Sequence, residues 1–226
     1  MKPLKKPGPC PDPDSYIYVR RRNGGYWRKK RGTGKPAVLN TVLAANAENT
    51  KLTMPAARRM LAKLKPFTEN FARDFRLQRV ATVFSRDLKE TGEMSYRLFD
   101  RFEMQRDHPL QNIYMTNPKI GINKKMMEVT IDLHGDPLWQ KTPTATHYYF
   151  ELILLSGDPA KENALRVESD SSALYEYERE YDDKIILTIQ LPDKKPYMVF
   201  LKCGCMQDRW PAGHAKNYGM KVVGVG

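Results

Sequence analysis

The residues with the clearest chemical potential form a cluster of cations and aromatic rings near the N-terminus. Seven cationic side chains fall within twelve residues, and four aromatic residues lie beside them. The cations are Arg20, Arg21, Arg22, Arg28, Lys29, Lys30 and Arg31, and the aromatic residues are Tyr16, Tyr18, Tyr26 and Trp27. Cations neutralise phosphate or carboxylate groups, and aromatic rings stack on bases or hold guanidinium groups. The cluster is therefore a candidate binding site for a polyanion.

Three interpretations of this cluster stay open. In the first, the cluster docks on an acidic protein surface or another polyanion. In the second, it binds nucleic acid through phosphate contacts and base stacking. The third is a solvated edge hairpin whose charges prevent strand-to-strand aggregation. Arg58 and Arg59 join the candidates, because they lie on the polar side of a helix predicted over residues 53–65. A nucleic-acid binder would need that helix and the hairpin to share one exposed face.

The positive charge of the chain is concentrated in its first 65 residues. The formal net charge is +12, and residues 1–65 hold 16 Lys and Arg against three acids, Asp12, Asp14 and Glu48. Residues 66–107 hold eight bases and eight acids, and residues 108–226 hold 14 bases and 15 acids. Such segregation produces a local positive field, which suits a phosphate backbone or another polyanion.

The cluster sits on a predicted β-hairpin. Residues 15–22 and 26–31 are rich in residues that favour strands, and Asn23-Gly24-Gly25 supplies the positive φ angles of a tight turn. Residues 1–14 are rich in proline and predict a flexible, extended arm.

The next segment has helical periodicity. Residues 53–65 place an apolar residue at every third or fourth position, and Pro66 is expected to end that helix. A second helix is predicted from Thr68 to Gly92, with Phe71 and Phe75 burying its first turns on a second side. A third, short helix is predicted over residues 95–104.

After Pro109 the apolar period changes to two. Residues 125–133, 146–155, 184–191, 197–205 and 218–225 predict strands, and residues 165–169 and 174–178 are weaker candidates. The fold class is α+β: a basic hairpin, two or three helices and a C-terminal antiparallel β-sandwich. The turn that leads into Tyr197 resembles the tyrosine corner of immunoglobulin-like sandwiches, so that form is one option. The expected domains are the arm 1–14, the hairpin with the helical region 15–109, and the sandwich 110–226.

Three motifs with catalytic or cofactor chemistry are excluded. The segment Arg31 to Pro36 fails as a phosphate loop, because Lys29 stands where a glycine is required and Pro36 replaces Ser or Thr. Cys203 and Cys205 would need two further ligands to hold a metal, so ordinary structural cysteines are the better interpretation. The acidic run from Glu176 to Asp183 is typical of a solvated face. We therefore expect no enzyme activity, no metal and no cofactor.

The chain also lacks signals for membranes and secretion. No window approaches the roughly 18 apolar residues of a membrane span, and no apolar region follows the charged N-terminus. Three cysteines do not make a disulfide framework. We expect a cytoplasmic protein with reduced thiols.

Residues 15–110 resemble an uncharacterised family of bacterial proteins. The resemblance rests on residues 16–32, on the helix that begins at Ala56-Ala57-Arg58-Arg59 and leads to Lys65-Pro66-Phe67, and on the second helix. The family has no assigned activity, so the resemblance implies no site.

Overall fold

The structure is a computed structural model, and it divides the chain into two compact units, residues 1–44 and 45–226. The second unit is called the body. The structure describes residues 9, 12, 14–21, 24–30, 40–72, 74–114, 118–133, 144–177, 179, 181, 184–208 and 210–226.

The first unit contains two strands that pair with each other and are called the ribbon. Strand β1 (Tyr16–Arg21) runs antiparallel to strand β2 (Gly24–Lys29), with Tyr18 opposite Trp27. Gly24, which the sequence predicts in the turn, is instead the first residue of β2. Arg22 and Asn23 of the turn, and most of the proline-rich arm, lie outside the described residues.

Two α-helices follow the ribbon, α1 (Thr41–Thr68) and α2 (Arg76–Thr91). Three short 3₁₀ helices lie further along the chain: η1 (Arg97–Phe99), η2 (Leu110–Asn112) and η3 (Ala215–Asn217).

Helix α1 begins twelve residues earlier than the sequence predicts. Its cap is Asn40, whose side-chain oxygen accepts a hydrogen bond from the Leu43 amide at 2.8 Å. No residue between 41 and 52 is buried. Because this part of the helix packs no apolar stripe against a core, its sequence lacks the helical periodicity that would have predicted it. Pro66 lies inside the last turn of α1 instead of ending it.

The second and third helices are shorter than predicted. Helix α2 starts at Arg76 and not at Thr68, and the predicted third helix is reduced to η1. Phe71 is buried as expected, but Phe75 is 77% exposed. The expectation that Phe75 is buried is therefore wrong, because Phe75 precedes α2 and lies outside its packed face.

Nine strands build the body's sheets together. They are β3 (Lys119–Asn123), β4 (Met126–Asp132), β5 (His147–Ser156), β6 (Arg166–Ser171), β7 (Tyr175–Glu176), β8 (Lys184–Gln190), β9 (Tyr197–Gln207), β10 (Trp210–Pro211) and β11 (Tyr218–Val225). The five stronger strand predictions coincide with β4, β5, β8, β9 and β11.

The strands form two antiparallel sheets. One has the order β10-β9-β5-β6, with β11 also paired to β9 and β7 to β5, and the other has the order β3-β4-β8. The predicted α+β class with antiparallel sheets is confirmed.

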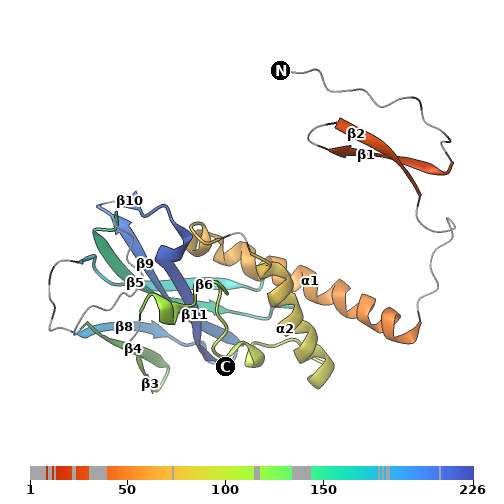
Figure 1. Ribbon diagram of the computed structural model, residues 1–226. Helices are drawn as coiled ribbons and strands as arrows, with labels where there is room; N and C mark the ends of the chain where they lie inside the picture. The colour runs from red at the N-terminus through yellow and green to blue at the C-terminus, as the bar shows by residue number, and fades with distance from the viewer. Residues whose placement is uncertain are drawn as a thin grey trace. The chain divides into compact units, whose positions relative to one another are not determined.

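The larger sheet is buried on both faces. On β5, Phe150 and Leu152 belong to an apolar core shared with β4 and β8, whereas Ile153 and Leu155 belong to a core shared with α1 and α2. The three-stranded sheet therefore covers one face and the helices cover the other (Figure 1). Because the strands of the larger sheet contribute to both cores, residues 45–226 form a single packed unit.

A buried carboxylate fixes the segment that follows α2. Asp87 has no exposed surface, and it accepts hydrogen bonds from the Ser95 amide at 2.6 Å and the Ser95 hydroxyl at 2.8 Å. The Arg97 guanidinium pairs with the same carboxylate. Burial alone would raise the pKa of Asp87, but the bonds from Arg97 and Ser95 outweigh it and hold the pKa below its usual value.

No helix in the described part of the chain is long and apolar enough to cross a membrane.

We expect Phe84→Ala to destabilise the body by about 3–5 kcal/mol, because it empties a site in the helix-facing core. Phe84 is fully buried, and its ring lies 4.9 Å from that of Phe99. The control is Phe75→Ala, which should change the free energy of unfolding by less than about 0.5 kcal/mol. Urea unfolding followed by circular dichroism and by fluorescence measures both. Separate transitions for the helices and the strands would contradict a shared core.

We also expect acid to weaken the Asp87 contacts. Because the pKa of Asp87 is lower in the folded chain, its contribution is complete above the unfolded value of about 4 and is lost as the pH falls through the folded value. Asp87→Asn should therefore lower stability at pH 7 and flatten its decline below about pH 4. Asp100→Asn, at an exposed position, is the control. Parallel pH profiles for wild type and Asp87→Asn would refute this role.

Candidate functional site

The register of β1 and β2 gives the ribbon one strongly aromatic face. Tyr18 lies opposite Trp27, and Tyr16 lies opposite Lys29, so these four side chains project to the same side. The Tyr18 and Trp27 rings are in contact, with centroids 5.3 Å apart and planes tilted by 58°. Tyr18 is 41% exposed. The aromatic residues that the sequence singled out thus include a ring pair that solvent can reach.

The opposite face of the ribbon mixes apolar residues with one arginine. Ile17 lies opposite Arg28, and Val19 lies opposite Tyr26, which is 40% exposed. The Nε of Arg28 is buried and has no hydrogen-bond partner among the described residues. A buried donor without an acceptor is unfavourable.

The described lysines of the ribbon region are exposed and unpaired. Lys29 and Lys30 are exposed, and neither forms an ion pair within 4 Å in the described part of the chain. The Ser15 side chain and the Asp14 amide donate hydrogen bonds to Asp12, which lower the pKa of that carboxyl. Lys30 adds a smaller electrostatic contribution, and Asp12 therefore stays ionised at neutral pH.

The remaining cations of the cluster are only partly described. Arg20 and Arg21 lie in β1, whereas Arg22 and Arg31 lie outside the described residues.

Arg58 and Arg59 lie on α1 in the body and have different roles. Arg58 is exposed. The guanidinium of Arg59 donates hydrogen bonds to the carbonyl oxygens of Pro159 and Ala160, both at 2.9 Å. Arg59 therefore holds a loop of the body, and its guanidinium is not available as an open anion contact. Sequence patterns could not predict these contacts, because the partners are backbone carbonyls about 100 residues away.

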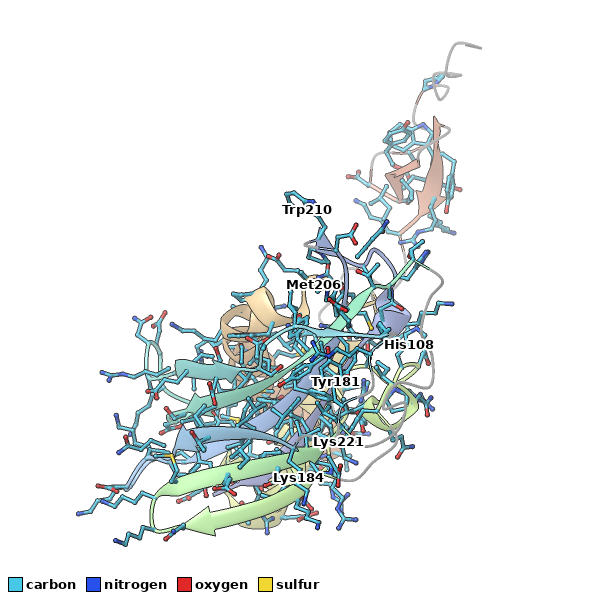
Figure 2. The ribbon with its side chains drawn as sticks, turned by 90° about the vertical axis from the view of Figure 1, so that its left-hand side faces the viewer. His108, Tyr181, Lys184, Met206, Trp210 and Lys221 are labelled. Carbon is cyan, nitrogen blue, oxygen red and sulfur yellow. The ribbon has the colours of Figure 1, made fainter. Side chains whose placement is uncertain are left out.

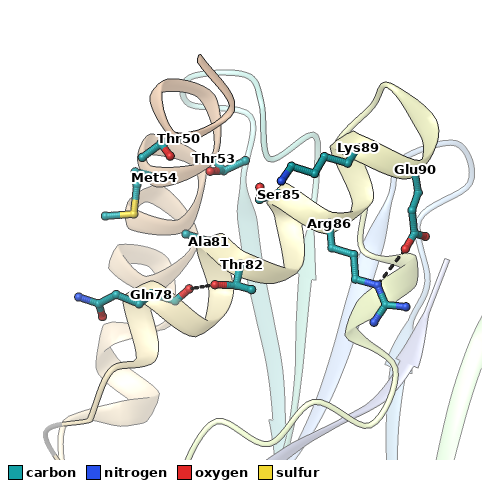
Figure 3. Close-up of a pocket in the computed structure, with 10 residues that line it drawn as sticks. All are labelled: Thr50, Thr53, Met54, Gln78, Ala81, Thr82, Ser85, Arg86, Lys89 and Glu90. Carbon is teal, nitrogen blue, oxygen red and sulfur yellow. Dashed lines mark hydrogen bonds and ion pairs between the residues drawn. The ribbon is translucent and has the colours of Figure 1, made fainter. Parts of the chain in front are cut away.

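A groove between α1 and α2 offers hydroxyl groups but no catalytic arrangement. Figure 3 shows Thr50 and Thr53 on α1 facing Thr82, Ser85 and other residues of α2. The Thr82 hydroxyl donates to the Gln78 carbonyl at 2.8 Å, and the Thr50 hydroxyl donates to the Asn46 carbonyl. Neither hydroxyl is in contact with a base that could activate it.

The two C-terminal cysteines are buried between the two sheets. Both belong to the core, and the Cys205 sulfur lies 3.0 Å from the Tyr177 hydroxyl. Burial raises the pKa of Cys205 to about 11, and burial and the nearby Cys205 raise the pKa of Cys203 well above its usual value. Both thiols are therefore protonated at neutral pH, and a protonated thiol is a poor metal ligand.

Further metal ligands are also lacking in the part of the chain that is described. No group of three or more His, Cys, Asp or Glu side chains there has the arrangement of a metal site. Cys10, the third cysteine of the chain, lies outside the described residues. Tyr148 lies opposite Cys205 in the pairing of β5 with β9, and its ring stacks on that of Tyr175. The Tyr175 ring also contacts that of Tyr181, which Figure 2 labels.

Sequence patterns missed one buried ion pair. Lys202 of β9 and Glu151 of β5 lie opposite each other, and their side chains form an ion pair at 2.9 Å. The ammonium also lies 5.9 Å from the centre of the Phe67 ring at the end of α1. A charged residue in the middle of an apolar strand was the available signal. The pair connects α1 with the sheet.

Comparisons with known proteins find no match: no family model, no curated protein and no solved structure is significantly similar to the chain. The resemblance of residues 15–110 to a bacterial family consequently adds no site.

We expect Cys203 and Cys205 to be inert in the folded protein. In a Cys10→Ser variant, the remaining thiols should react with a disulfide reagent at pH 8 at least about 100-fold more slowly than in denaturant. Metal analysis of the same sample should find less than one zinc per chain, unchanged by Cys203→Ser with Cys205→Ser. Fast native labelling, or zinc that disappears in the double variant, would show that the cysteines are ligands.

Proposed function

We propose that the protein is a non-enzymatic binding or assembly protein whose basic N-terminal region binds an acidic protein surface or another polyanion. The observation that carries this proposal is the ribbon: exposed, unpaired lysines and exposed aromatic rings on a unit separate from the packed body. The body supplies a stable attachment for that region.

The electrostatics of the sequence support the proposal. No acid occurs between Asp14 and Glu48, so the cations of the ribbon have no local partner in the sequence. Their mutual repulsion decreases when a polyanion binds, and the counterions released from the polyanion favour association. A partner with clustered carboxylates or phosphates therefore fits this unit.

The absence of enzyme activity belongs to the same proposal. Asp87, Cys203 and Cys205 have shifted pKa values, and each is explained by contacts that build the fold. In the α1–α2 groove, the Thr50 and Thr82 hydroxyls bond to backbone carbonyls. A perturbed group in a cleft is the usual mark of a catalytic site, and these groups do not have that arrangement.

Nucleic acid is the second candidate, and the aromatic face of the ribbon favours it. Tyr16, Tyr18 and Trp27 lie on one side, with Lys29 beside them. Single-stranded nucleic acid is held by such a combination, because bases stack on the rings while cations contact phosphates. An acidic protein partner would instead bury Trp27 or Tyr26 at its interface.

The proposal also includes two finer statements about the fold and one about the location of the protein in the cell. We infer that the ribbon is a closed β-hairpin and that the two sheets of the body form a β-sandwich, for which the immunoglobulin-like form stays an option. The shared apolar core between the sheets supports the sandwich. A cytoplasmic location is consistent with two buried, unpaired cysteines.

We expect binding of labelled polyanions to weaken steeply with salt. Four or five phosphate contacts give a log–log slope near −4, since each contributes about 0.7–0.9. Replacing Arg20, Arg21 and Arg22 with alanine should flatten the slope. Trp27→Ala should weaken binding to single strands and leave the slope nearly unchanged, because stacking is not ionic. Anisotropy titrations across a salt series, with single- and double-stranded DNA and RNA and with poly-glutamate, measure these effects.

The comparison of ligands separates the two candidates. Ile17→Ala is the control for Trp27→Ala, because Ile17 lies on the other face of the ribbon. Binding of poly-glutamate at least as tight as binding of single strands supports the acidic-protein function. Preference for single strands with a Trp27 effect supports nucleic acid. No binding of any polyanion at low salt would overturn the proposed function.

A further inference from the structure

The topology of the body brings two loops that carry lysines to one end of the larger sheet. The last residue of β5, Ser156, pairs with both Tyr197 at the start of β9 and Arg166 at the start of β6. Loop 157–165 and loop 191–196 therefore leave the sheet side by side.

These loops and the helices border a groove of about 890 Å³, called the loop groove. Leu52 of α1 and the end of α2 line one side of it, and loop residues and Arg166 line the other. Sites for small organic ligands typically have volumes of roughly 300–1,000 Å³. The loop groove is therefore large enough for a ligand of that size.

Cations dominate the loop side of the groove. Arg166, Lys194 and Lys195 line it, and none of them forms a hydrogen bond or ion pair within the described residues. Lys161 also lines the groove, but it pairs with Asp158 at 3.4 Å. Three cations without partners, contributed by two adjacent chain segments, suit a group with two negative charges.

The helix side of the groove has the opposite character. Leu52, Leu88 and Met94 line it, and Leu52 is 53% exposed. The last carbonyls of α2 and Glu93 also lie on this side, and both are unfavourable for an anion. The anionic group of a ligand therefore belongs at the loop side, and an apolar or ring-shaped portion of the ligand belongs at the helix side.

The backbone beside the cations is held in place before any ligand arrives. The Gly157 carbonyl accepts a hydrogen bond from the buried Tyr96 hydroxyl at 2.9 Å, and the Gly157 amide donates to the Pro196 carbonyl at 2.8 Å. Arg59 holds the same loop through two carbonyls. Gly157 has a φ of +113°, and a Cβ there would lie 2.2 Å from the Ala164 oxygen. Only glycine fits this position.

We propose that the loop groove binds an organic phosphate. The phosphate group contacts Arg166, Lys194 and Lys195. The apolar or ring-shaped portion of the ligand covers Leu52, Leu88 and Met94. The inference is independent of the proposed function, because it concerns the body and a small ligand. A free nucleotide and a single-chain lipid phosphate share this chemistry. The two are distinguished by whether the groove prefers a nucleoside or an alkyl chain.

Calorimetric titration of the full chain tests the proposal with four probes: AMP, adenosine, octyl phosphate and inorganic phosphate, each up to about 1 mM. At least one of the two organic phosphates, AMP or octyl phosphate, should bind at least about tenfold more tightly than both inorganic phosphate and adenosine. Inorganic phosphate lacks the apolar or ring-shaped portion, and adenosine lacks the phosphate. Preference for AMP indicates a nucleotide, and preference for octyl phosphate indicates a lipid.

Variants at exposed positions assign the contacts without disturbing the core. Lys194→Glu with Lys195→Glu should weaken the organic phosphate by at least about tenfold, and Leu52→Ser by about threefold. Lys119→Glu with Lys124→Glu makes the same charge change outside the groove and should have no effect. Replacing Arg20, Arg21 and Arg22 with alanine should also have no effect.

Two results would overturn the assignment. The first is the absence of binding by both organic phosphates. The second is an equal loss in the Lys119/Lys124 and Lys194/Lys195 variants, which would show a general charge effect instead of a site.

Discussion

The structure depends on the pairing of β5 with β9, two long antiparallel strands whose side chains are buried on both faces of their sheet. A sheet of this kind needs an apolar cover on each side, because exposed apolar strand faces would aggregate. The three-stranded sheet supplies one cover and the two helices supply the other. This requirement explains why the helices belong to the same packed unit as the strands, although the two regions differ completely in their sequence periodicity.

The same constraint determines what the body's polar groups do. Asp87, Arg59 and the Lys202–Glu151 pair connect helices, loops and sheet, so they are occupied by contacts that build the fold. A buried charge without a partner would be strongly destabilising, which leaves such groups little freedom for chemistry. Open cationic groups are found instead on the ribbon and around the loop groove. The proposed recognition of anions is therefore separated from the core that supports it.

Sequence patterns predicted the strands that contribute apolar side chains to a core. Strands β4, β5, β8, β9 and β11 were located because each has one face, or both, in a core. The first half of α1 was missed because no residue between 41 and 52 is buried. The sequence also identified the cations and rings of the ribbon. It did not reveal the loop groove, because Arg166 and Lys194 meet only through strand pairing.

The central claim is that the ribbon, and not the body, binds a macromolecular polyanion. Hydrogen exchange followed by mass spectrometry tests it most directly, with the full chain measured alone and with a saturating polyanion at low salt. The account predicts slower exchange of amides in residues 16–30, where a two-stranded sheet alone is only marginally stable, and unchanged exchange in β5 and β9. Unchanged exchange in residues 16–30 under saturating conditions, with protection confined to the body, would contradict it.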